Sequence, residues 1–400
     1  NEKTIKIGIK LIYLLIVLYL LVIVYKYELN GTPRGYYRLN MVFAYMILAL
    51  VAGLRFRLGS DAYAYEYYIN NTAVGIMDID SGDVWDGFYQ PGWVVLTSIA
   101  KSLGHYLYLQ MFVSFVSVFS VYFFLKKNTN FFASSTLFFF ISFYHYFSVE
   151  ILREALAISI FLGAMTVFKE RKVVSFVLCC ASILFHKFAV LTIFIYILLT
   201  FNFGLKRFVL FISIIILASV YFKNPLSVIT VLYSAIGTIN FETYELGGEM
   251  SVFGVLLYTS KILLPLIAIL YGYKRRHVIS MYIPPRVFYI FCGLTSSIYL
   301  IRLISFPYVE RLNNYFIIFV ITYSATLTII FLKKQTFVVR NCLFIFIFFG
   351  AVIFNWLPLM KPNVDGLPGY AMYYPYSSYL NPSIDESRQS LLYSRFGNTE

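Results

Sequence analysis

Long uncharged apolar runs alternate with short polar connectors along almost the whole chain. A helix needs roughly 20 mostly apolar residues to cross a bilayer, and several runs approach that length. Because their apolar residues are continuous and do not alternate with polar ones, the runs favour helices over membrane β-strands. The pattern predicts membrane helices at 5–25, 39–54, 105–125, 131–148, 151–168, 172–185, 188–204, 208–222, 252–271, 286–301, 312–331 and 337–356. The sequence therefore predicts an all-α, polytopic integral membrane protein with about 12 transmembrane helices.

Two segments depart from this simple pattern. Residues 91–103, PGWVVLTSIAKSL, are too short and too polar for a span, so we expect an amphipathic or re-entrant interfacial helix. His186 and Lys187 interrupt the apolar stretch 172–204. We interpret that stretch as two short helices meeting at a polar hinge, and one long tilted helix is the alternative.

Composition and charge place the chain in the membrane and assign its sides. Hydrophobic residues make up 60% of the chain and charged residues 13%, far from the balance of a soluble domain. The net charge of +13 comes largely from basic residues in short connectors, which marks the cytoplasmic side and does not indicate nucleic acid. With Lys126 and Lys127 inside, the polar helix ends near 55, 150, 186 and 302–311 all face outside, and only the N-terminal lysines break the rule.

The chain is interpreted as a single membrane domain, 1–400, without an internal repeat or a soluble domain. Its predicted outer segments are 55–104, which includes the interfacial helix, 223–251, and the polar tail 357–400. Outer loops of this length are long for a pure transporter, and long loops tend to be functional.

The first candidate site is the stretch GLRFRLGSDAYAYEYY at 53–68. Arginine forks bind phosphate oxygens in pairs, and Gly59 allows a tight turn that would gather the charges. Interfacial anchoring is the alternative for the arginines and tyrosines, but a carboxylate gains nothing from it. We predict substrate contacts for Arg55, Arg57 and Tyr65, and a catalytic role for Asp61.

Three further polar groups lie at predicted outer helix ends. Glu150 and Arg153 are three residues apart, which places them on one helix face, where a structural ion pair is the alternative. His186 at the hinge could move a proton, or could simply be a hydrogen-bonded hinge residue. The last group accompanies a helix start and is predicted to bind substrate: Arg302, Glu310, Arg311 and Tyr315.

Nothing in the sequence predicts a metal or another cofactor. Asp78 and Asp80 form a D-x-D pattern, but three residues are a weak signal and nucleotide sugars are absent outside the cell. The four cysteines lie in apolar runs, and the four histidines are far apart without ligand spacing.

Several of these segments, in this order, resemble the motifs of the EpsG-like family of bacterial polysaccharide polymerases, a branch of the Wzy-type O-antigen and capsule polymerases. They are RFRLGSDAYAY (55–65), YQPGW (89–93), EILREALAISIFLGAM (150–165), ASILFHKFAVL (181–191) and VERLNNYF (309–316). The chain departs from the family pattern in having Gln90 for Glu, Ser60 for Thr and Glu154 for Gln. The first departure argues against an acid–base role at position 90.

The resemblance implies a metal-independent, lipid-dependent glycosyltransferase of the multi-span GT-C type in the bacterial cytoplasmic membrane. It would transfer a glycan from undecaprenyl pyrophosphate to the non-reducing end of a new lipid-linked repeat at the outer face. The expected partners are undecaprenyl pyrophosphate-linked oligosaccharide, membrane lipids and a chain-length regulator protein.

Within that reaction we expect four arginines to meet the pyrophosphate: Arg55 and Arg153, with Arg302 and Arg311 as further contacts. His186 beside Lys187 would stay neutral and is expected to be the base or a hydrogen-bond donor to the phosphate, with Asp61 orienting the acceptor and Glu150 as a further acid–base candidate.

The alternative function is a lipid-linked oligosaccharide flippase or a polysaccharide transporter. Such a protein needs polar residues at mid-membrane, whereas here the charges gather at one face and Lys261 is the exception. An acyltransferase would need a compact histidine–acid pair, which the sequence does not contain.

Overall fold

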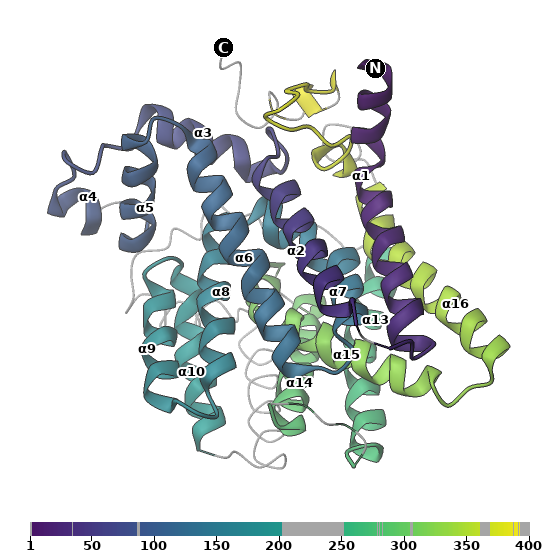
Figure 1. Ribbon diagram of the computed structural model, residues 1–400. Coiled ribbons are helices and arrows are strands. Elements are labelled where there is room, and N and C mark those ends of the chain that lie inside the picture. The colour runs from purple at the N-terminus through teal and green to yellow at the C-terminus, as the bar shows by residue number, and fades with distance from the viewer. Residues whose placement is uncertain are drawn as a thin grey trace. The chain divides into compact units, whose positions relative to one another are not determined.

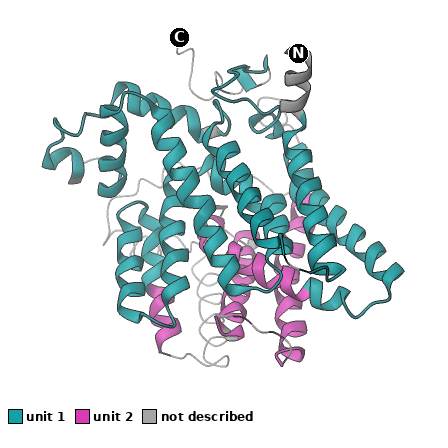
Figure 2. Ribbon diagram, viewed as in Figure 1, with its two compact units in different colours: residues 1–193, 328–400 teal, residues 194–327 magenta. Residues whose placement is uncertain are grey.

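The computed structural model describes residues 2–33, 35–85, 89–201, 252–277, 279, 281, 283–304, 307–360, 369–386, 388–390 and 392. This part of the chain is helical apart from isolated β-bridges that join Arg55 to Ser378 and Ser378 to Asn381. It divides into two compact units, 1–193 with 328–400 and 194–327 (Figure 2). Each unit is described by itself below.

Most of the described helices belong to the first unit, coloured from purple through blue to teal and again in yellow-green in Figure 1. Its elements are α1 (Glu2–Ile23), continued by the π-helical η1 (Val24–Leu29), α2 (Tyr37–Gly53), α3 (Ser60–Asn71), α4 (Ser81–Trp85), α5 (Pro91–Ser102), α6 (Tyr106–Asn128), α7 (Phe132–Phe139), the π-helical η2 (Phe140–Tyr144) and η3 (Tyr146–Glu150), α8 (Leu152–Val167), α9 (Lys172–Ile183), η4 (Lys187–Ala189), α16 (Phe337–Trp356), η7 (Leu357–Met360) and η8 (Gly369–Met372).

The second unit contains α13 (Val252–Lys274), α14 (Pro285–Ile304) and the 3-10 helix η6 (Pro307–Tyr315). Two helices begin in one unit and end in the other, α10 (Val190–Thr200) and α15 (Ile317–Leu332).

Helix α6 is the centre of the first unit and packs between α2 and α8 (Figure 1). Its small residues Ser114 and Ser117 are fully buried, which lets neighbouring backbones approach closely. Leu109 and Val113 near the start of α6 pack with Leu152 near the start of α8. The two helices therefore run parallel.

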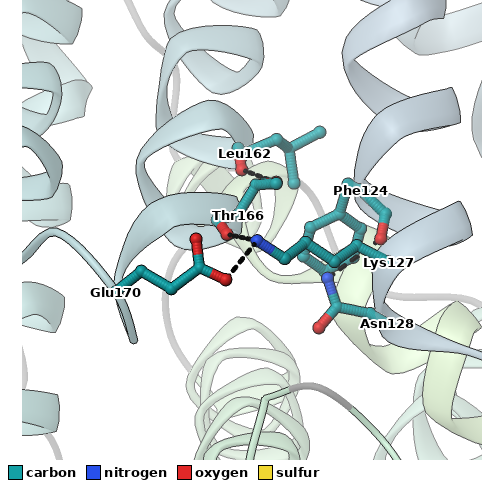
Figure 3. Close-up of polar contacts among 6 residues, drawn as sticks. All are labelled: Phe124, Lys127, Asn128, Leu162, Thr166 and Glu170. Atoms are coloured by element: carbon teal, nitrogen blue, oxygen red, sulfur yellow. Dashed lines mark hydrogen bonds and ion pairs between the residues drawn. The ribbon is translucent and has the colours of Figure 1, made fainter.

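The other ends of α6 and α8 are joined by polar contacts (Figure 3). The Lys127 Nζ donates to the Thr166 carbonyl oxygen at 2.9 Å and to the Glu170 Oε1 at 3.2 Å. A lysine near a helix C-terminus satisfies carbonyls that have no intrahelical partner. This contact fixes the ends of α6 and α8 that lie away from the candidate site.

A buried carboxylate joins three other elements. Glu28 in η1 accepts from the Tyr37 hydroxyl at 2.6 Å and from the backbone N–H groups of Ala133 and Ser134 at 2.7 and 2.9 Å. These N–H groups belong to the first turn of α7, where a negative charge is stabilised by the helix dipole. Glu28 therefore caps a helix that begins about a hundred residues later.

Four stretches among the described residues are long and apolar enough to cross a membrane: Leu11–Leu29, Tyr106–Asn128, Phe253–Lys274 and Phe337–Met360. Six shorter apolar helices accompany them. Many large apolar side chains on these helices are exposed, including Leu15, Leu264 and Phe346. Exposed apolar surface on this scale fits an integral membrane protein, since lipid covers it at no cost.

Each predicted helix within the described residues has a counterpart in the structure, but the one predicted at 312–331 begins later, at Ile317 of α15, after the 3-10 helix η6. The helix predicted at 208–222, the last residues of the one at 188–204, and 223–251 lie outside the described residues. The helix predicted at 91–103 is α5, and the hinge predicted within 172–204 separates α9 from η4 and α10. The alternative of one long helix there is wrong, because the helix ends at Ile183.

Two predictions of local structure need correction. Residues 55–104 were expected to form a loop with one helix, but they contain α3, α4 and α5, because α3 has an apolar face of Ala62, Tyr65 and Ile69 to bury. Glu150 and Arg153 do not share one helix. Ile151 at φ −90° and ψ 49° ends η3, and α8 begins at Leu152.

Candidate functional site

Segments far apart in the sequence meet beside the first turns of α6 and α8. Tyr65 of α3, Trp93 of α5 and Leu152 of α8 belong to one buried cluster, and Phe185 of the hinge packs against it. Three of the four polar groups singled out in the sequence are thus held by one apolar core.

Gly59 sets the geometry at the start of α3. Its φ is 86°, a backbone angle that residues with a side chain rarely adopt. A Cβ added at Gly59 would lie 3.0 Å from the Val149 carbonyl oxygen. The turn therefore brings α3 against the residue that precedes Glu150. Asp61 lies in the first turn of α3, where the helix dipole favours a negative charge.

Arg153 lies in the first turn of α8, and its guanidinium carbon is 4.7 Å from the centre of the Tyr89 ring. Its Nε is buried without a hydrogen-bond partner. Burial raises the pKa of both Tyr65 and Tyr89. The positive charge of Arg153 partly offsets this increase, and the negative charge of Asp61 adds to it. The charges of Arg153 and Asp61 therefore have opposite effects on the same two phenols, and Arg153 contacts the Tyr89 ring directly.

Glu150 at the end of η3 accepts a hydrogen bond from the hydroxyl of Tyr373, which belongs to the C-terminal segment. Burial raises the pKa of Tyr373 well above its usual value, and the charges of Glu150 and Asp61 raise it further. The phenol therefore stays protonated and remains a donor. We call Asp61, Tyr89, Glu150, Arg153 and Tyr373 the arginine–carboxylate site.

Arg55 is fully buried below this site. Its guanidinium donates to the Val149 carbonyl oxygen at 2.9 Å, to the Ala52 carbonyl oxygen and to the Ser114 Oγ at 3.4 Å. Burial lowers the pKa of Arg55. These bonds hold the backbone next to Glu150, which favours a positioning role, and the predicted pyrophosphate contact stays a prediction.

The other residues of the first stretch have separate surroundings. Arg57 donates through Nε to the Glu66 Oε2 at 2.9 Å, and its guanidinium stacks on Phe56 and Tyr63. Tyr65 is buried against Trp93, with ring centres 5.2 Å apart. The contacts of Tyr65 are those of a core residue, and its predicted substrate contact is untested.

The hinge is attached to the start of α5. The Gly92 N–H donates to the Leu184 carbonyl oxygen at 2.8 Å, and a Cβ on Gly92 would lie equally close to that oxygen. His186 follows two residues later, buried and 5.3 Å from the Phe188 ring. The structure brings the hinge to the core of the site, and the role of His186 as a base stays a prediction.

The fourth polar group lies in the second unit, where Glu310 is its centre. The Glu310 carboxylate lies 3.1 Å from the Lys261 Nζ and 3.9 Å from the Arg302 Nε, and it accepts from the Tyr258 hydroxyl. Both cations also face the Tyr258 ring, at 4.8 and 5.2 Å. By contrast, Tyr315 is fully buried and the Arg311 side chain is exposed.

Sequence reasoning missed Tyr373, Arg388, Tyr258 and the part played by Lys261. Tyr373 lies in a stretch rich in tyrosine, GYAMYYPYSSYL (369–380), which is an unusual composition for a polar tail, and Arg388 follows eight residues after its end. That signal could have drawn attention to the segment, but not to its partner.

The acidic pattern near 78–83 has a local structural explanation. Asp80 and Asp83 each accept the other's backbone N–H, at 2.8 and 3.2 Å. Among the described residues, no three His, Cys, Asp or Glu side chains are grouped as metal ligands would be.

The sequence profile of the EpsG family matches residues 38–378, which include every segment of the arginine–carboxylate site. The chain belongs to the EpsG family. EpsG-family proteins are membrane proteins associated with exopolysaccharide biosynthesis. No curated protein and no solved structure matches the chain.

Proposed function

We propose that this EpsG-family chain is a polysaccharide polymerase. It transfers a glycan from undecaprenyl pyrophosphate to the non-reducing end of a new lipid-linked repeat, at the outer face of the bacterial cytoplasmic membrane. The observation that carries the proposal is the grouping of Arg153 at the start of α8 with two carboxylates, Asp61 at the start of α3 and Glu150 at the end of η3. A pyrophosphate leaving group and an acceptor hydroxyl need these two kinds of residue.

In the proposed reaction the bond between the anomeric carbon and the pyrophosphate oxygen breaks. A bond to the acceptor oxygen forms, and the hydroxyl proton passes to a carboxylate or to His186. Arg153 matches the charge that develops on the pyrophosphate, which is expected to be the largest catalytic effect. Arg55 supports the backbone beside Glu150, and the reaction needs no metal.

The remaining members of the predicted set keep supporting roles. Arg302, beside Lys261, gives a second cationic group that suits a lipid-linked phosphate, and Arg311 is exposed to meet ligand. Arg57, Tyr65 and Tyr315 act through packing or pairing around the sites. The proposed architecture is a multi-span GT-C-type fold of about 12 spans, and a chain-length regulator in the membrane is the proposed partner.

The test compares Arg153→Lys with Arg171→Lys, whose exposed side chain lies at the far end of α8. Lysine keeps the positive charge but loses the planar guanidinium group and its stacking on the Tyr89 ring. Each charge-assisted hydrogen bond contributes about 1.5–3 kcal/mol, so we expect chain extension by Arg153→Lys to fall at least about tenfold. Normal long-chain glycan from Arg153→Lys at normal protein level contradicts the proposal.

A second candidate function is a lipid-linked oligosaccharide flippase or transporter. It is favoured by Lys261, which lies well inside the apolar helix α13 and is paired with Glu310. Surface glycan of a deletion strain separates the two functions. Loss of a polymerase leaves single repeats at the surface, and loss of a flippase leaves none.

A further inference from the structure

The C-terminal segment, described at residues 369–386, 388–390 and 392, docks on the turn that leads into α3. The Gly59 N–H donates to the Met372 carbonyl oxygen at 3.0 Å, and the Phe56 N–H donates to the Ser377 carbonyl oxygen at 2.9 Å. The Tyr379 N–H donates in turn to the Leu54 carbonyl oxygen at 2.8 Å. The segment is therefore held by backbone hydrogen bonds along the whole turn.

Arg388 fixes the shape of this segment from within. Its guanidinium is fully buried and donates to the carbonyl oxygens of Ala371 and Pro375, the first at 3.0 Å. These two carbonyls flank Tyr373. The Arg388 Nη1 is buried without a hydrogen-bond partner, so the two bonds to these carbonyls offset only part of the cost of burying the cation. They restrain the backbone on both sides of Tyr373.

The Tyr373 side chain of the docked segment is bonded to a carboxylate of the arginine–carboxylate site. Tyr373 is 8% exposed, and its hydroxyl donates to the Glu150 Oε2. Tyr376 makes a useful contrast. It is equally buried, but its hydroxyl donates to a backbone atom, the Val51 carbonyl oxygen, at 3.0 Å.

We infer that Tyr373 is a positioning residue. Its hydroxyl holds the Glu150 carboxylate in the orientation in which the carboxylate meets the acceptor hydroxyl. The docked C-terminal segment carries Tyr373 to this place. This inference rests on the proposed polymerase function. It gives a role in positioning Glu150 to the C-terminal segment, which lies far from the other site residues in sequence.

The experiment measures chain extension by the purified full-length protein in lipid nanodiscs, with lipid-linked repeat units as substrate. Tyr373→Phe removes one hydroxyl and keeps the ring, and Tyr376→Phe is the matched control. Loss of a hydrogen bond to a charged group gives an expected fall in kcat of about tenfold for Tyr373→Phe, with KM nearly unchanged. Tyr376→Phe lowers the unfolding temperature and keeps the wild-type kcat.

A double-mutant cycle separates action through Glu150 from a general structural effect. If Tyr373 acts through Glu150, then Tyr373→Phe combined with Glu150→Gln is no slower than Glu150→Gln alone. Additive losses in the double variant overturn the inference, and so does a kcat for Tyr373→Phe equal to that of Tyr376→Phe.

The same data distinguish failure of the inference from failure of the proposed function. If the wild-type protein extends no chain, or Glu150→Gln is as fast as wild type, the proposed function or its site assignment is wrong. If Glu150→Gln is slow and Tyr373→Phe is normal, only the inference about Tyr373 is wrong.

Discussion

At the scale of single residues, the position of Glu150 depends on a glycine and a buried arginine. Gly59 makes the turn that lets α3 approach Val149, and Arg55 bonds the carbonyl of that same residue. Neither residue needs to touch substrate to control the geometry of the site. Both act on the backbone from which Glu150 projects.

Replacing Gly59 by alanine tests this control. Gly104 is the matched control, because its φ is 85° and a Cβ there would meet nothing within 4 Å. A positive φ costs alanine about 1–2 kcal/mol, and this is the whole loss of unfolding free energy expected for Gly104→Ala. At Gly59 the ψ of 150° places the backbone in a region that is nearly restricted to glycine, and the contact with the Val149 oxygen adds to this strain, so we expect more than about 2 kcal/mol and shortened glycan chains.

Thermal unfolding in detergent and glycan ladders from cells measure the two effects. Equal losses of stability in the two variants, with normal ladders from Gly59→Ala, mean that the approach of α3 to Val149 does not control the site.

At the scale of elements, the helices themselves were largely predictable, because the length and position of each apolar run indicate where a helix begins and ends. The hinge at His186 and the helix α5 were predicted for the same local reason. A break between 148 and 151 was predicted too, but not its exact place: the π-helical turns continue to Glu150 and the chain breaks at Ile151. The prediction that Glu150 and Arg153 share one helix face, which assumed a continuous helix, was therefore wrong.

The candidate site was predictable only in part, for a related reason. Asp61, Glu150 and Arg153 stand out because charges are rare in an apolar sequence, and polar residues at the end of a membrane segment are a functional signal. Tyr373 is one of 36 tyrosines and lies 223 positions from Glu150. No local pattern predicts a partner at that separation.

Contacts between distant elements also stabilise the fold, and Glu28 is the clearest case. Both carboxylate oxygens of Glu28 accept from backbone N–H groups, so Glu28→Gln turns one acceptor into an NH2 group that faces a donor, and we expect a loss of about 2 kcal/mol in unfolding free energy. Glu170→Gln is the control, since its carboxylate is 58% exposed and pairs with Lys127. An exposed pair contributes under about 1 kcal/mol.

Thermal unfolding of the two purified variants gives the comparison. If Glu28→Gln is no less stable than Glu170→Gln, the buried carboxylate is not what holds η1 and α7 together.

At the scale of the whole molecule, the parallel course of α6 and α8 places the arginine–carboxylate site and the basic connectors at opposite helix ends. The site lies at the starts of both helices, and Lys127 with Glu170 marks their other ends. Lysine and arginine in short connectors mark the cytoplasmic side. The charge pattern and the packing of this unit therefore favour one orientation, with the site outside.

Thiol labelling of intact cells tests that orientation. Met77, between α3 and α4, is 93% exposed and belongs to the side of the site, whereas Arg171 follows the end of α8. Cys180 and Cys342, which are not fully buried, are first replaced by serine. We expect a membrane-impermeant maleimide to label Met77→Cys in intact cells, and to label Arg171→Cys only after the membrane is opened. The reverse pattern would place the arginine–carboxylate site in the cytoplasm and exclude polymerisation at the outer face.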